Sequence, residues 1–487
     1  MNRLHFLTQF LQHPSAANIA TLVLLGVVVL AVCYLVSRID LAVIVVVGLF
    51  LEMFSGSWSL MGVPLPLDRL ALLLALVVLV LKGARWTSSR RLVLRPVHVV
   101  LLLALTWATA SALVAGTLFN SLGFYALLDR FGLVPFALFC LAPLVFGSNK
   151  QRNVLLVGLV AIGLYLSVTA VLEGLHAYKL IFPHYIADPN VGIQFGRARG
   201  PLLETTGDGF CIFTGAVGAA TALGSWRSWW GRAACILTMM LAGPALLLTL
   251  TRGVWIGATV GTLVAMFVHK RTRPFVVPLI VTGLLAVVVA LSVSPALRSE
   301  VRTSADRQAS VWDRQNTDLA ALRIVEEYPL TGVGWENFIN VSSEYMRQQP
   351  GYPITGLDLE VHNVFLSHAA ELGVPGLLLW ALGLGGAMRR ALFRKRSRPL
   401  AMTGEGSDEA SSMPPWWEQW RPGGLAIVLC FVVEANLAPF SEPLPNALLW
   451  IWLGILAIPY TSTLRLPMRQ SAPGDQLAAR EQLPVFA

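Results

Sequence analysis

The residue of this chain best suited to chemistry is His362, which lies where a long polar segment meets an apolar one. The polar segment, 293–362, is rich in arginine, and the sequence then runs into SHAAELGVPGLLLW. An imidazole near the start of a helix feels the positive end of the helix dipole, which lowers its pKa. Because a neutral imidazole can take a proton from an attacking hydroxyl group, we expect His362 to be a general base. Histidines at such positions can also be caps or interfacial residues.

Two carboxylates precede this histidine. Asp358 and Glu360 alternate with His362, so in an extended segment the three side chains share one face. A carboxylate there could orient the imidazole, and we include both residues in the expected catalytic group. The same Asp-x-Glu pattern could instead bind a divalent cation, since hard cations favour oxygen ligands. We expect no metal and no other cofactor, with the divalent cation as the alternative.

Arginines outside the polar segment could hold an anion. Arg252 interrupts two apolar runs, and an arginine at that depth is costly unless a partner or a water-filled cavity receives it. Arg197 and Arg199 would point the same way in an extended strand, roughly 7 Å apart. Guanidinium groups bind phosphate oxygens through two hydrogen bonds, so converging arginines predict a phosphate or diphosphate ligand.

Other arginines are ambiguous. Arg130, in LLDRFGL, could pair with a carboxylate or bind the ligand, and we include it among the candidate diphosphate-binding residues. For Arg302 and Arg323, in the long polar segment, contact with solvent or lipid headgroups is the favoured interpretation.

The composition is that of a polytopic membrane protein. Of 487 residues, 55% are hydrophobic and only 13% are charged, against about 25% in soluble domains. Spans need roughly 20 apolar residues, and such runs predict about 12 or 13 membrane helices. The expected fold is all-α, with a large extracytoplasmic loop that contains short helices. The predicted spans are 18–36, 40–56, 66–82, 97–117, 123–146, 152–173, 205–224, 231–250, 253–269, 274–293, 363–387, 423–440 and 445–461.

The net charge of +9 reflects topology and does not indicate a nucleic-acid partner. Basic clusters occupy alternate connections, as the positive-inside rule requires of cytoplasmic loops. The segments 174–204 and 293–362 then face outward. The basic clusters lie at 82–96, 148–152, 225–232, 269–274 and 388–399.

We expect one integral membrane domain, 1–464, followed by a disordered cytoplasmic tail, 465–487. Within the domain, 388–422 should be a flexible cytoplasmic connection whose PPWWEQW segment anchors at the membrane interface. In the outward loop, an amphipathic helix within 304–327 should end before Pro329. Its expected apolar face is Val311, Gln315, Leu319, Leu322 and Val325.

The order of motifs resembles the O-antigen ligase and O-antigen polymerase superfamily. The motifs are GRARGPLLETTGD, LTLTRGVWIG, DRQASVWDRQNTDLAALRIVEEYPLTGVGWENF and HNVFLSHAAELGVPGLLLW, and they cover roughly 195–390. Arg199, Arg252 and His362 match the conserved arginines and the loop histidine of that superfamily. Thr251 stands where many relatives have serine.

The resemblance implies a GT-C-type glycosyltransferase in the bacterial cytoplasmic membrane, with its active site on the outer face. It would transfer a glycan from undecaprenyl diphosphate to an acceptor hydroxyl, without metal. The expected partners are this lipid-linked donor, a glycan or lipid A-core acceptor, and membrane lipids. An O-antigen ligase is the favoured interpretation. A polysaccharide polymerase or protein-glycosylating relative is the alternative, and a solute transporter is the alternative from another class.

Overall fold

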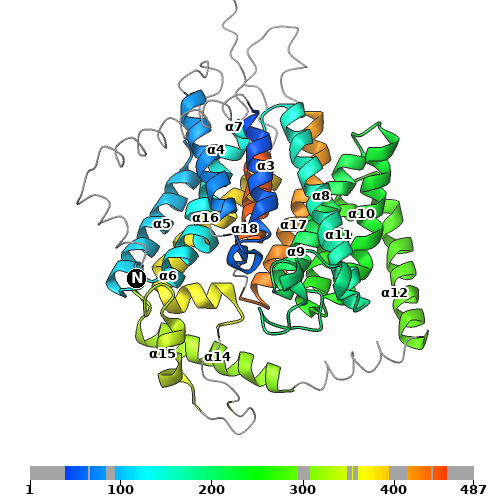
Figure 1. Cartoon of the computed structure of the whole chain (residues 1–487). Coiled ribbons are helices and arrows are strands. Elements are labelled where there is room, and N and C mark those ends of the chain that lie inside the picture. Colours follow the sequence, from blue (N-terminus) through cyan, green and yellow to red (C-terminus); the bar gives the residue numbers. More distant parts are fainter. Residues whose placement is uncertain are drawn as a thin grey trace, which may run out of the picture.

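A computed structural model describes residues 39–63, 66–83, 94–293, 308–347, 354, 360–393, 414–439 and 442–457. These parts of the chain form helices and connecting turns, so the all-α prediction is confirmed (Figure 1). Asp358, Arg302, the first predicted span and the C-terminal tail lie outside the described residues.

The apolar runs form helices close to the predicted bounds. Within the described residues, five helical stretches are long and apolar enough to cross a membrane, and shorter apolar helices accompany them. The helices are α3 (Leu41–Glu52), α4 (Leu67–Gly83), α5 (Pro96–Val114), α6 (Ser121–Tyr125), α7 (Leu133–Val145), α8 (Asn149–Gly174), α9 (Thr205–Leu223), α10 (Trp229–Leu248), α11 (Arg252–Val268), α12 (Val276–Val293), α16 (Val364–Leu392), α17 (Pro415–Ala435) and α18 (Pro443–Leu456).

Helix α18 is at the centre of this bundle. Every residue from Leu444 to Leu456 is buried, so the helix is enclosed by other parts of the protein on all sides. Figure 1 shows α18 between α5 and α6 on one side and α11 on the other. In contrast, α12 carries exposed valines and leucines such as Val277 and Leu284, as expected of a helix that faces lipid.

The long polar loop lies across one end of the bundle. Its described part contains α14 (Gln308–Glu327) and α15 (Phe338–Tyr345), which Figure 1 shows below the helix ends. The basic connections meet elsewhere: Lys150, Arg152 and Arg227 line one hollow together with Trp416 of α17. His269 and Arg271 line a second hollow, which also includes Pro415. These connections therefore gather around the beginning of α17.

The structure corrects the bounds of the connection expected at 388–422. Helix α16 continues to Leu392 and α17 already begins at Pro415. The tryptophans of PPWWEQW belong to the bundle, since Trp417 and Trp420 are 5% and 3% exposed. The Trp417 indole donates to the Leu456 carbonyl at 3.1 Å, which ties this segment to α18.

Helix α16 is broken at Gly373, and the loop fills the break. Gly373 has φ +69°, a left-handed conformation that glycine adopts without strain. The break frees carbonyl groups of the preceding turn, and the segment TGVGW caps them: the amides of Val333 and Gly334 donate to the Ala370 and Glu371 carbonyls at 2.9 and 3.0 Å. The Trp107 indole donates to the Leu372 carbonyl at 2.9 Å. The loop and α16 are thus joined along their backbones.

The loop helix buries a different face from the one predicted. Helix α14 ends at Glu327, before Pro329, as expected. However, Val311 and Leu322 of the predicted apolar face are 52% and 46% exposed. Small side chains make the contact, because α14 packs closely against α16: Ala320, Ala321 and Ile324 form a cluster with Phe338, Val361 and Ala370.

Candidate functional site

His362 lies directly before the cap of α16. The Asn363 side chain is the cap, and its Oδ1 accepts from the Leu366 amide at 3.0 Å. The imidazole is half-buried, and its Nδ1 is buried without a hydrogen bond of normal geometry. Burial of the ring, and next the nearby Arg314 guanidinium, lower the pKa of His362 from its ordinary value of 6.5. The lowered pKa favours the neutral imidazole at pH 7, which is the form that a general base requires.

Arg314 of α14 connects His362 to Arg252. The positive charge of its guanidinium lowers the pKa of His362. The pKa of Arg314 is itself lowered, first by burial and then by the positive charge of Arg252. The three side chains therefore form one group of cationic and titratable residues at the loop end of the bundle. From the sequence, Arg314 is one of several arginines of the long polar segment and shares a helix face with Arg307, and it was not included in the expected site. Its place near His362 depends on how α14 packs on α16, which the sequence interpretation did not predict.

Arg252 is exposed and is the first residue of α11. Thr251 precedes it, and the Thr251 hydroxyl donates to the Thr205 hydroxyl at 2.8 Å. A Cβ atom on Gly253 would lie 3.5 Å from Leu437, so the start of α11 packs beside the end of α17.

The end of α17 also contacts the start of α16. The Asn363 side-chain amide donates to Asn436 Oδ1 at 3.4 Å. The start of α11, the end of α17 and the start of α16 therefore converge, and this arrangement brings Arg252 to the same end of the bundle as His362.

Arg199 has a structural arrangement that the sequence did not indicate. Its side chain is 0% exposed, and its Nη1 and Nη2 groups donate to the carbonyls of Val191, Ile193, Ile186 and Asp188. All four terminal N–H groups are thereby occupied. Burial lowers the pKa of Arg199. These contacts favour a role in holding the 186–193 turn, and they leave no terminal N–H for a diphosphate. Arg197 lies half-buried in the same segment.

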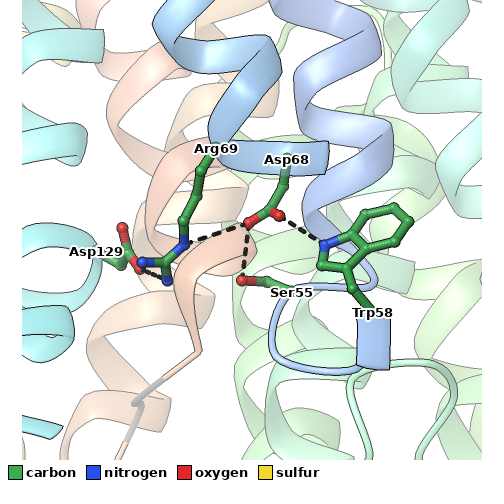
Figure 2. Close-up of polar contacts among 5 residues, drawn as sticks. All are labelled: Ser55, Trp58, Asp68, Arg69 and Asp129. Carbon is green, nitrogen blue, oxygen red and sulfur yellow. Dashed lines mark hydrogen bonds and ion pairs between the residues drawn. The ribbon is translucent and has the colours of Figure 1, made fainter. Parts of the chain in front are cut away.

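Arg130 and its neighbour Asp129 belong to two separate ion pairs. Arg130 Nη1 lies 3.3 Å from Glu336 Oε1 of the loop. Asp129 instead forms an ion pair with Arg69 at 2.6 Å. The Asp68 carboxylate accepts hydrogen bonds from the Ser55 hydroxyl and the Trp58 indole (Figure 2). A π-helical turn, Ala126–Phe131, carries both Asp129 and Arg130. Arg130 is thus paired with the loop, and its expected role in binding the diphosphate stays a prediction.

The expected carboxylates near His362 are only partly described. Glu360 is half-buried and lines a cavity together with Arg130 and Glu336. Burial is the main cause of the raised pKa of Glu336, and the Arg130 guanidinium opposes it. In the part of the chain that the structure describes, no group of three or more His, Cys, Asp or Glu residues could hold a metal ion. Asp358 is outside that part, so its expected role with Glu360 stays a prediction.

The fold and this site define a polytopic, all-α membrane protein with a polar, arginine-containing site at one end. Residues 237–381 match the sequence profile described as O-antigen ligase. The match confirms the resemblance to the O-antigen ligase and polymerase superfamily over the part of the chain that contains Arg252, α14, His362 and the break of α16. It supports a membrane enzyme of the ligase or polymerase type. A comparison with curated proteins gives no match.

Proposed function

We propose that this protein is a glycosyltransferase of the bacterial cytoplasmic membrane. In this proposal it transfers a glycan from undecaprenyl diphosphate to an acceptor hydroxyl at the outer face, and it acts as an O-antigen ligase on lipid A-core. The observation that carries the proposal is the convergence of the starts of α11 and α16 at the end of α17, which brings Arg252 and His362 to one end of the bundle. Arg314 of α14 lies near the imidazole and lowers its pKa.

In the proposed reaction, Arg252 and Arg314 bind the diphosphate of the donor. His362 takes the proton of the acceptor hydroxyl as its oxygen attacks the anomeric carbon. The bond from that carbon to the diphosphate breaks, and the two guanidinium groups stabilise the charge that develops on the leaving group. Helix α14 carries Arg314 and packs on α16, so we propose that it also covers the reacting atoms and excludes water.

The test uses purified protein in lipid nanodiscs, with a lipid-linked glycan as donor and lipid A-core as acceptor. His362→Ala should abolish transfer and leave donor binding largely unchanged, whereas Arg252→Ala should weaken donor binding as well. Full transfer by His362→Ala would contradict the mechanism. A product in which repeat units are joined on the carrier would indicate a polymerase, and solute uptake by proteoliposomes without transfer would indicate a transporter.

A further inference from the structure

A cavity of about 160 Å³ lies beside the proposed reaction site. It is formed by the α5–α6 connection, the π-helical turn, α15 and the turn before it, the first half of α16, the end of α17 and the start of α18. Glu360 and Val361 line it, and they directly precede His362 in the chain. One wall of the cavity therefore leads directly into the segment that carries the histidine.

The cavity contains a buried polar group without a partner. His368 is 8% exposed and lines the cavity, and its Nδ1 has no hydrogen-bond partner. The aromatic rings of Phe131, Trp335 and Trp380 surround it, with centroids 5.3, 5.8 and 4.7 Å from the imidazole. Buried polar atoms are almost always hydrogen-bonded, because an unpaired one is costly. The arrangement indicates that a ligand supplies the partner.

The chemistry of the walls fits a neutral polyhydroxyl compound. Glu336, Glu360 and Glu371 all line the cavity, and the cation among them, Arg130, is paired with Glu336. Carboxyl groups, whether ionised or protonated, can hydrogen-bond to the hydroxyl groups of a sugar. Trp335 and Trp380 offer flat apolar faces of the kind that contact the C–H face of a sugar ring.

We propose that this cavity is a sugar subsite, and that it holds the acceptor sugar whose hydroxyl is activated by His362. The inference rests on the proposed function. Displacement at an anomeric carbon places the attacking oxygen opposite the leaving group. The residues that line the cavity include Glu360 and Val361, the chain neighbours of the base, but neither Arg252 nor Arg314, which hold the diphosphate in the proposed reaction. We therefore assign the cavity to the acceptor and not to the leaving group.

A larger side chain at position 367 would fill the cavity without removing a charged group, because the native residue is Ser367. It is half-buried, lies on α16 and lines the cavity. Ser367→Leu should raise the KM for lipid A-core by about tenfold or more, which corresponds to about 1.4 kcal/mol. The KM for the lipid-linked donor should not change. Ser367→Ala is the matched control, because it removes the hydroxyl group without filling the space. His368→Phe retains a ring but removes Nδ1, and it should also raise the acceptor KM.

The possible outcomes distinguish failure of the subsite proposal from failure of the proposed function. Binding of the lipid-linked donor in the absence of acceptor, together with the thermal unfolding temperature, shows whether a variant is folded and binds donor. If folded Ser367→Leu and His368→Phe keep the wild-type acceptor KM, the subsite is wrong. If only the donor KM rises, the cavity holds the donor's sugar and the acceptor assignment is overturned. Absence of transfer by the wild type, or full transfer by His362→Ala, would instead overturn the proposed function.

Discussion

The carbonyl of Pro329 accepts a hydrogen bond of 2.8 Å from the amide of Val374, directly after the break in α16. This bond joins the end of the loop helix to the membrane helix that follows His362. Two glycine motifs that are far apart in the sequence, PLTGVG and ELGVPG, are therefore two halves of one structural unit.

Gly373→Ala should destabilise this unit. A Cβ atom at Gly373 would lie 2.5 Å from the Leu330 carbonyl group, and its φ of +69° is unfavourable for alanine. We expect a loss of about 1–3 kcal/mol in unfolding free energy and a large loss of transfer activity. Gly385→Ala in the same helix is the control, since no atom lies within 4 Å of its Cβ position. Equal unfolding temperatures for the two variants would contradict this role of Gly373.

The acidic limit of activity should follow the protonation of His362. Its pKa is lowered from 6.5, so the rate at saturating donor should stay constant near pH 7 and fall only below that ordinary value. Arg314→Gln removes a positive charge that disfavours the imidazolium, so the pKa should rise and the acidic limb should move to higher pH. Arg323→Gln makes the same charge change elsewhere on α14 and is the control. An unmoved limb in Arg314→Gln would show that Arg314 does not act on the base.

Arg199→Lys should destabilise the protein even without substrate. Lysine cannot reach the four carbonyls that the Arg199 guanidinium contacts. We expect a loss of about 3 kcal/mol or more, with faster proteolysis within 186–193. Lys179→Gln removes an exposed cation from the same segment and should have little effect. A stable Arg199→Lys protein with weakened donor binding would instead support the diphosphate role predicted from the sequence.

Substitutions of Arg69 and Asp129 should have non-additive effects on the free energy of unfolding. Asp129 is buried, and its carboxylate lies 2.6 Å from the Arg69 guanidinium (Figure 2). Arg69→Leu should cost about 1–3 kcal/mol, because it leaves Asp129 without this partner and Arg69 is itself partly exposed. The double variant Arg69→Leu/Asp129→Leu should recover part of that loss. Additive effects in the unfolding temperatures would show that the pair contributes nothing.

The sequence predicted the membrane helices well, because lipid imposes a length and an apolar composition that are visible in every run. For example, the span expected at 152–173 is α8, Asn149–Gly174. Contacts between distant segments could not be predicted in this way. Nothing in the sequence near Arg130 indicates Glu336 as its partner, and the carbonyls around Arg199 belong to the backbone, which carries no sequence signal. The predicted buried face of α14 was wrong, because a pattern of large apolar residues does not reveal contacts made by alanine.

The break at Gly373 also leaves the first turns of α16 attached to the loop. Residues 364–372 are joined to α14 and to the 329–334 turn, and Val374, just beyond the break, is joined to Pro329. His362 directly precedes these turns. A displacement of α14 and the 329–334 turn away from the bundle would therefore also displace the proposed base.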